Sequence, residues 1–177
     1  YMKRLKEFLP DCLSQLFYVN SGSEAIEASL KAAKLFTQRS EVISCCGSYH
    51  GSTIGAVSML SDEIFTRNFR PLIPDCNKIE YNNFDDIQKI TERTACLVLE
   101  PVAIGQGVRL PKDGWLQAVR KRCDEVGAIL IFDEIQTGFG RTGIESLSIG
   151  TIIAFLGMSR NFTMTINQLS NQVSMIA

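Results

Sequence analysis

The chain has 177 residues, of which 45% are hydrophobic, and its formal net charge is -1 at pH 7. This length provides one good-sized core or part of a larger domain, and the composition is that of an ordinary globular protein. The near-neutral charge excludes a strongly basic surface, and so argues against nucleic acid or an anionic membrane as partner. The longest apolar stretch, residues 149–158, is too short to span a bilayer.

The cysteines show neither a disulfide framework nor a metal site. Their spacing is irregular, no C-x-x-C pair is present, and the chain has a single histidine. We therefore expect reduced, buried thiols, no bound metal and a cytoplasmic protein. The six are Cys12, Cys45, Cys46, Cys76, Cys96 and Cys123.

Short apolar runs alternate with helical patterns between residues 16 and 133. We expect strands at "LFYVN" (16–20), "VISCC" (42–46), "KIEY" (78–81), "ACLVLEP" (95–101) and "AILIFDE" (128–134). Helical patterns lie at 21–38 and near 52–60, 84–93 and 114–126. Near-continuous apolar strands separated by helices predict an α/β fold, a mostly parallel sheet with helices on both faces.

The first helical pattern carries the clearest local signals. Ser21 and Glu24 have the spacing of a capping box, and Glu27 and Lys31 have the spacing of an ion pair on the outer face. Four apolar residues recur at helical spacing and should face the core: Ile26, Leu30, Ala33 and Phe36.

Polar clusters follow four of the predicted strands, at residues 20–23, 49–51, 100–101 and 133–134. Ligands of parallel sheets bind just beyond the carboxyl ends of the strands. The sequence therefore predicts a site at one edge of the sheet.

Two nucleotide-binding patterns in the chain are incomplete. "ILIFDE" (129–134) resembles the strand that holds magnesium in P-loop ATPases, but the chain has no G-x-x-x-x-G-K-[ST] loop. "GFGRTG" (138–143) matches the dinucleotide fingerprint, but residues 134–137 separate it from the strand, no helical pattern follows, and no acidic residue stands where ribose binding needs one. We interpret it as a glycine-rich turn.

Three other motifs each have two interpretations. The small residues of "NSGSEA" (20–25) leave backbone N–H groups free for a phosphate, or they form an ordinary N-cap. His50 follows an aromatic residue at a strand end, which favours a flat ligand, although a lone histidine is usually structural. Asp133 ends a buried strand and needs a partner, either a structural cation or the protonated nitrogen of a pyridine ring.

Taken in order, four segments resemble the class III (ornithine/acetylornithine-type) aminotransferases of the pyridoxal-phosphate fold-type I superfamily. These are "YVNSGSEAIEASLKAAK" (18–34), "SYHGST" (48–53), "LVLEPV" (97–102) and "RCDEVGAILIFDEIQTGFGRTG" (122–143). The resemblance implies that residues 1–143 are part of the cofactor-binding large domain. The tail, 144–177, does not match, and we expect it to be out of frame or disordered.

The resemblance also implies roles for individual residues. Tyr49 would stack on the ring of pyridoxal 5'-phosphate, Asp133 would pair with its nitrogen, Ile135 would lie beneath the ring, and Gln136 would lie near its 3-hydroxyl group. Glu100 matches an active-site glutamate, and with Asp133 it is a catalytic candidate. The residues expected to bind the cofactor are Ser21, Gly22, Ser23, Tyr49, His50, Gly51, Asp133, Ile135 and Gln136.

The activity implied is transfer of an amino group from an amino acid or amine to a 2-oxo acid or aldehyde, by intact relatives that are homodimers. Gly105 stands where many relatives have a second glutamate, so substrate preference is not carried over. The family's Schiff-base lysine should lie roughly 25 to 30 residues after Asp133, but the last lysine is Lys121. We therefore expect a chain that is inactive as written; the alternative is a non-catalytic remnant that binds the cofactor weakly.

Overall fold

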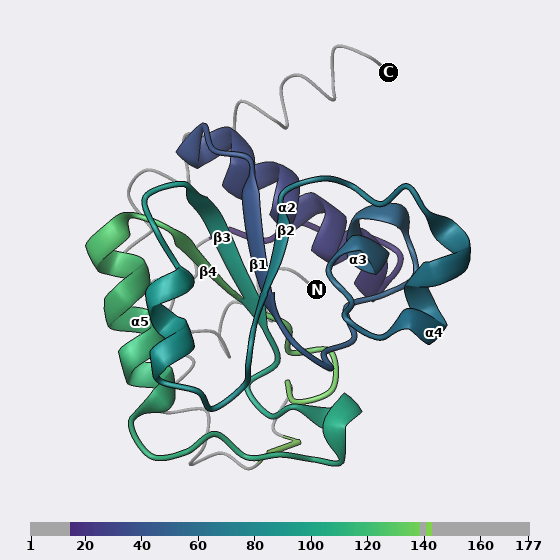
Figure 1. Ribbon diagram of the computed structural model, residues 1–177. Helices are drawn as coiled ribbons and strands as arrows, with labels where there is room; N and C mark the ends of the chain where they lie inside the picture. Colours follow the sequence, from purple (N-terminus) through teal and green to yellow (C-terminus); the bar gives the residue numbers. More distant parts are fainter. Residues whose placement is uncertain (1–14, 139–140, 143–177) are drawn as a thin grey trace.

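The computed structural model describes residues 15–138 and 141–142 (Figure 1). The helices are α2 (Gly22–Thr37), α3 (Ile54–Ser58), α4 (Glu63–Thr66) and α5 (Trp115–Val126), and the strands are β1 (Glu41–Cys45), β2 (Cys76–Ile79), β3 (Thr94–Leu99) and β4 (Ile129–Phe132). Short 3-10 turns occur at Arg67–Phe69, Asp85–Lys89 and Ile104–Gln106. The expectations for Cys12, for the apolar stretch 149–158 and for the tail lie outside these residues. Within them, no helix has the length and apolar character needed to cross a membrane.

The strands form one parallel sheet in the order β2-β1-β3-β4. β1 pairs with both β2 and β3, so that Val42 stands level with Cys76 on one side and Cys96 on the other. β3 and β4 pair in register from Cys96 opposite Ile129 to Leu99 opposite Phe132. The carboxyl ends of all four strands therefore lie at one edge of the sheet, as predicted.

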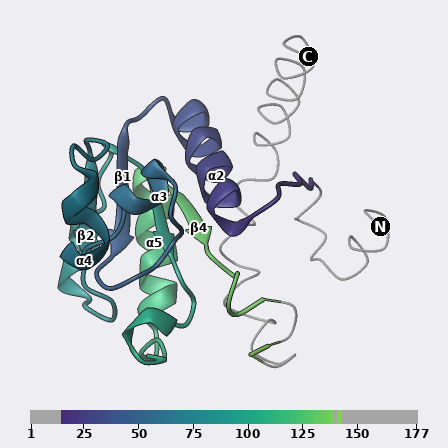
Figure 2. The same ribbon diagram turned by 90° about the vertical axis from the view of Figure 1, so that its right-hand side faces the viewer.

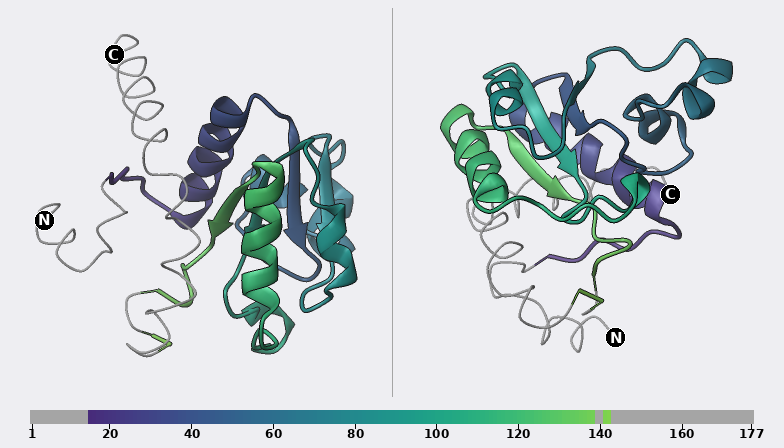
Figure 3. Two further views of the ribbon diagram at one scale, coloured as in Figure 1. Left: turned by 90° about the vertical axis from the view of Figure 1, so that its left-hand side faces the viewer. Right: turned by 60° about the horizontal axis from the view of Figure 1, so that its bottom comes forward.

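Helices cover both faces of the sheet, which confirms the predicted fold class (Figure 3). On one face, Leu97 and Leu130 pack in a core cluster with Trp115 of α5, which is fully buried. On the other face, Val98 and Ile129 pack in a second cluster with residues of α2 and α3. Every residue of β3 is buried, as expected of a strand with apolar layers on both sides.

The predicted strand "LFYVN" is wrong. Residues 16–20 join no strand of the described sheet, and the side chains of Phe17 and Tyr18 are 60% and 50% exposed. A short apolar run has no periodicity that separates a strand from an extended approach to a helix. The pattern at 84–93 is also only partly helical, because a single 3-10 turn, Asp85–Lys89, forms there.

Helix α2 begins as its capping signals predict. Ser21 is the N-cap, and its hydroxyl accepts a hydrogen bond from the Glu24 N–H at 3.2 Å. The Glu24 carboxylate reaches back to the Asn20 N–H at 2.6 Å, one residue before the position of an ideal capping box. Ile26 and Leu30 of the predicted stripe are buried against the sheet; Ala33 is buried with them and Phe36 partly so.

The predicted ion pair between Glu27 and Lys31 is wrong. One oxygen of the Glu27 carboxylate instead accepts hydrogen bonds from the N–H groups of Gly55 and Ala56, at 2.8 and 3.3 Å. These donors lie in the first turn of α3, where backbone N–H groups lack helical partners, and they outcompete a solvent-exposed pair that is worth little. Glu27 thereby fixes α3 to the first half of α2.

Candidate active site

The structure brings the predicted polar clusters together at the carboxyl edge of the sheet. Residues 46–53, which leave β1, reach both the start of α2 and the end of β4 through hydrogen bonds. Figure 2 shows the first turn of α2 beside the segment that leaves β4. Asp133 and Ser21–Ser23 therefore lie at the same edge of the sheet, which is the arrangement that a shared ligand site needs.

Gly51 makes a close approach to α2 possible. The Ser52 N–H donates to the Ser23 hydroxyl oxygen at 3.1 Å. Gly51 has a φ of +124°, and a Cβ there would lie 2.3 Å from the same hydroxyl oxygen. Only glycine meets both conditions, because L side chains rarely adopt this φ and no space remains for one.

The first turn of α2 offers unused hydrogen-bond donors. Among the described residues, no acceptor meets the backbone N–H groups of Gly22 and Ser23, whereas the next two N–H groups bond to Ser21. Ile135 closes over this turn, since a Cβ on Gly22 would lie 3.0 Å from the Ile135 Cδ1. Free N–H groups at a helix start attract an anion, so this turn is suited to a phosphate.

His50 is the partner of Asp133. The His50 Nδ1 lies 2.8 Å from the Asp133 Oδ2, and both side chains are almost fully buried. The other carboxylate oxygen of Asp133 accepts the Ile135 N–H at 3.1 Å. No described group bonds to the His50 Nε2, although it is buried. Each carboxylate oxygen has a second lone pair, so Asp133 retains the capacity to accept from a ligand.

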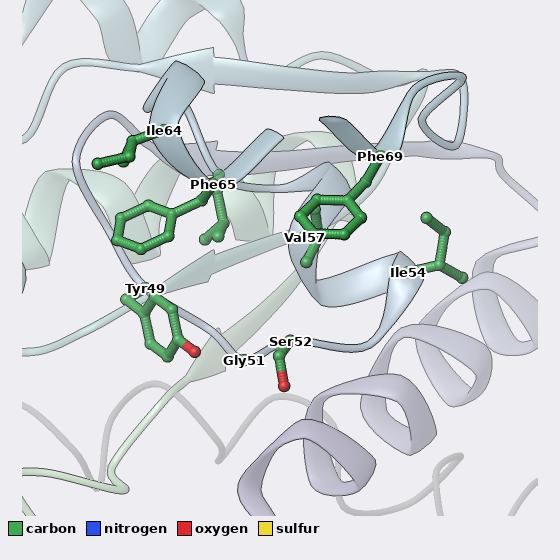
Figure 4. Close-up of a pocket in the computed structure, with 9 residues that line it drawn as sticks. Tyr49, Gly51, Ser52, Ile54, Val57, Ile64, Phe65 and Phe69 are labelled. Carbon is green, nitrogen blue, oxygen red and sulfur yellow. The ribbon is translucent and has the colours of Figure 1, made fainter. Parts of the chain in front are cut away.

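Tyr49 stands at the rim of this site with its ring half exposed. Phe65 packs edge-on against it, with the ring centroids 5.7 Å apart at 66°. Figure 4 shows Tyr49 beside an apolar hollow that also includes Ile54, Phe65 and Phe69. The hollow has a volume of about 320 Å³. The half-exposed Tyr49 ring therefore offers surface on which an aromatic ligand can stack.

Glu100 is buried, and its carboxylate is occupied by backbone donors. One oxygen accepts the Tyr49 N–H at 3.0 Å, and the other accepts the Ile104 N–H at 3.1 Å. Gln136, in contrast, is exposed. The sequence assigns no site role to Ser52, which lies within "SYHGST", and pairs Glu27 with Lys31. Only the fold reveals that Ser52 bonds to Ser23 and that Glu27 bonds to the start of α3.

The thiols and the nearest strand lysine are not reactive groups of this site. Burial raises the pKa of the Cys96 thiol to about 12 and raises that of Cys46 to about 11, so both stay protonated near neutral pH. Burial lowers the pKa of Lys78, whose Nζ donates to the Ser58 carbonyl at 3.2 Å. Lys78 lies on β2, and two strands, β1 and β3, separate β2 from β4, which Asp133 follows.

Comparison with known proteins decides the family. Residues 1–146 match the family model described as Aminotransferase class-III. The chain belongs to this family. Its members are pyridoxal-phosphate-dependent transaminases of fold type I, which confirms the predicted resemblance, fold and cofactor. The match says nothing of individual roles at the site, which stay predictions.

Two curated relatives have similar sequences. The [LysW]-aminoadipate semialdehyde/glutamate semialdehyde transaminase of Sulfurisphaera tokodaii is 38% identical over 80% of this chain and 37% of its own length. The acetylornithine aminotransferase of Methanosarcina mazei is 45% identical over 72% of this chain and 33% of its own. The chain thus spans about a third of the length of these relatives.

Solved transaminases share the fold. The ornithine aminotransferase of Toxoplasma gondii ME49 aligns with a TM-score of 0.66 and 32% identity, over 70% of this chain and 32% of its own. The adenosylmethionine-8-amino-7-oxononanoate aminotransferase of Methanocaldococcus jannaschii DSM 2661 aligns with a TM-score of 0.70 and 32% identity. The alignment covers 79% of this chain and 35% of that protein. An amine transaminase from an uncultivated Pseudomonas species, solved in its PLP-bound form, has a TM-score of 0.70 and 25% identity, over 78% and 38%.

The residues present fit pyridoxal phosphate. The cofactor is an anion joined to an aromatic ring with a basic nitrogen. This edge of the sheet offers free N–H groups at Gly22 and Ser23, an exposed ring at Tyr49 and a buried carboxylate at Asp133. Gly51 keeps the approach to this turn clear of a side chain. Among the described residues, no group of three or more His, Cys, Asp or Glu is placed to hold a metal ion.

Proposed function

We propose that this chain is a cofactor-binding part of a class III aminotransferase that moves an amino group from an amino acid or amine to a 2-oxo acid or aldehyde. The observation that carries the proposal is the convergence of the α2 start, Tyr49 and Asp133 at one edge of the sheet. Membership of the family supports it. Because the chain spans about a third of its relatives, the activity is that of the longer proteins.

In this proposal the first turn of α2 holds the phosphate. The N–H groups of Gly22 and Ser23 donate to it, and so does the Ser23 hydroxyl, whose oxygen already accepts from Ser52. Ser21 shapes the turn as the N-cap. Phosphate oxygens accept several charge-assisted hydrogen bonds at once, so three donors in one turn make a strong anchor.

The ring would lie between Tyr49 and Ile135, near the Gln136 side chain. When bound, pyridoxal phosphate supplies an electron sink for the charge that develops as the substrate loses a proton. The Asp133 carboxylate would hold a proton on the ring nitrogen, because a buried anion favours the cationic form of its neighbour. His50 keeps the carboxylate in place through its 2.8 Å hydrogen bond. Glu100 is the second catalytic candidate.

These 177 residues alone are proposed to bind the cofactor without catalysing transamination. The family's reaction needs a lysine amine as covalent nucleophile, and no lysine follows Lys121 in the sequence. Lys78 donates to the Ser58 carbonyl from β2, which β1 and β3 separate from β4 and Asp133. The alternative is a remnant that binds the cofactor weakly and has no catalytic role. The lack of a lysine after Lys121 favours it equally, and the affinity for pyridoxal phosphate distinguishes the two.

Residues 1–143 are proposed to form part of the large domain, and 144–177 a tail outside it. The intact protein is proposed to be a homodimer, supported by the exposed Ile64 and Phe69 around the hollow beside Tyr49. A reducing, cytoplasmic setting is supported by the free thiols of all five described cysteines. Nucleic acid and membranes are not proposed as partners.

The test is to add pyridoxal phosphate to the chain, reduce with borohydride, denature in acid and measure the retained cofactor absorbance. We expect cofactor bound before denaturation, none fixed to one specific lysine afterwards, and no turnover of an amino donor. A cofactor reduced onto one lysine, together with turnover, would contradict the proposed inactivity. Absence of any specific binding would contradict the proposed site.

A further inference from the structure

Glu100 joins the loop after β1 to the turn after β3, two loops that the Gln106 side chain also connects by donating to the Cys46 carbonyl. It follows β3 directly, and only 5% of the residue is exposed. Its two carboxylate oxygens accept from Tyr49, in the loop after β1, and from Ile104, in the 3-10 turn Ile104–Gln106. An ionised carboxylate is an acceptor on both oxygens, and each oxygen here meets one backbone donor.

We propose that Glu100 is a positioning residue that fixes the backbone of Tyr49 and so sets the ring face offered to the cofactor. This inference rests on the proposed function, since it concerns the same site. It gives Glu100 a role through Tyr49, in place of the catalytic role that the sequence resemblance implies. The adjacent residue, His50, is held by Asp133 through its side chain.

The orientation of the Tyr49 ring depends mainly on the position of its backbone, because few side chains pack around the ring. The Tyr49 ring is half exposed, and its ring contact is a T-shaped one with Phe65. The consecutive residues Tyr49 and His50 are instead anchored to the ends of β3 and β4, through Glu100 and Asp133. Two anchors on neighbouring residues fix both the position and the rotation of this short segment.

Replacing Glu100 by glutamine keeps one of its two backbone hydrogen bonds, to Tyr49 or to Ile104, and removes the other. The amide oxygen can accept from one N–H, but the amide NH2 group then faces the other donor and leaves it unsatisfied. We expect pyridoxal phosphate to bind about tenfold more weakly to Glu100→Gln, which corresponds to the loss of roughly one hydrogen bond. Inorganic phosphate should bind within about twofold of wild type, because the first turn of α2 keeps its own capping.

The experiment compares the full chain, Glu100→Gln and a matched control, Glu41→Gln. Glu41 is also a buried carboxylate, but it accepts from the side chains of Asn77 and Thr94 at the amino end of the strands. For each protein the affinity for pyridoxal phosphate, the inhibition of that binding by inorganic phosphate and the thermal midpoint are measured. Glu41→Gln should have a lower thermal midpoint than wild type, with unchanged affinities for pyridoxal phosphate and for inorganic phosphate.

The positioning role is contradicted if Glu100→Gln binds pyridoxal phosphate as wild type does. It is also contradicted if the affinities for cofactor and phosphate fall in proportion, as a general loss of packing would produce. If Glu100→Gln does not fold, Glu100→Asp carries the same comparison, since its shorter carboxylate reaches only one donor. Wild-type protein that binds no pyridoxal phosphate would instead refute the proposed function itself.

Discussion

At the residue scale, Gly51 shows how a single backbone position controls the site. Its φ of +124° and the 2.3 Å approach of the Ser23 hydroxyl oxygen to the position of a Cβ leave no room for alanine. Gly107 offers a matched comparison, because its φ is +82° and nothing lies within 4 Å of its Cβ position. Gly107→Ala therefore reports the cost of a positive φ where no contact is added.

We expect Gly51→Ala to lower the free energy of unfolding by about 3 kcal/mol and Gly107→Ala by about 1 kcal/mol. Urea denaturation of both variants measures the difference. Gly51→Ala should also weaken phosphate binding, since the Ser23 hydroxyl must move. Equal losses of stability in the two variants would show that the contact between Gly51 and Ser23 is unimportant.

The buried pair of His50 and Asp133 answers a question that the sequence poses and leaves open. A carboxylate at the end of an apolar strand needs a partner, and the sequence allowed a salt bridge or a ligand nitrogen. The structure supplies His50, which lies 83 residues earlier in the chain. No local pattern could have identified this pairing, because it depends on the parallel order of β1, β3 and β4.

At the scale of elements, helix α2 owes its start to one hydroxyl. The Ser21 hydroxyl accepts the Glu24 N–H, while the N–H groups of Gly22 and Ser23 have no acceptor among the described residues. We expect Ser21→Ala to cost about 1 kcal/mol of stability, the usual value for an N-cap. Urea denaturation measures this cost.

Ser29→Ala is the control for Ser21→Ala. The Ser29 hydroxyl bonds to the Ile26 carbonyl within the same helix, and alanine has the higher helix propensity. This variant should therefore be neutral or stabilising. A larger loss of stability in Ser29→Ala than in Ser21→Ala would contradict the role given to the cap.

The strands were predictable to different degrees. β3 and β4 could be identified because apolar residues fill them almost without interruption, as strands buried on both faces require. "LFYVN" has the same composition over a similar length, yet Phe17 is 60% exposed. What separates the two is packing against distant elements, and that information is absent from a five-residue window.

The same limit applies to contacts between helices. The apolar stripe and the cap of α2 follow from local spacing, and both were predicted. The partner of Glu27 was not, because Gly55 and Ala56 lie 28 and 29 residues away. Glycine at position 55 is necessary for this contact, since a Cβ there would lie 2.4 Å from the Glu27 carboxylate.

At the scale of the whole molecule, large apolar side chains remain exposed around the hollow beside Tyr49. Ile64 is 68% exposed and Phe69 58% exposed. Grouped apolar residues of this kind favour association. We therefore expect the chain to self-associate and to unfold with poor cooperativity.

Ile64→Lys should reduce this association, as measured by sedimentation at several concentrations. Leu110→Lys is the control, because Leu110 is also 68% exposed but does not line the hollow. Equal effects of the two substitutions would mean that the hollow has no special part in association. A sharp, reversible unfolding transition of a monomeric wild-type chain would contradict the expectation itself.

The carboxyl edge of the sheet is proposed to bind pyridoxal phosphate through the start of α2 and Asp133. The most direct measurement is an equilibrium titration of the chain and of Asp133→Asn with pyridoxal phosphate. Asparagine can still accept the His50 N–H through its oxygen, but its NH2 group then faces the Ile135 N–H, so the thermal midpoint of the variant is measured beside its affinity. We expect saturable binding that inorganic phosphate inhibits, and an affinity about tenfold lower in Asp133→Asn. Unsaturable binding, or equal affinity in the two proteins, would contradict this proposal.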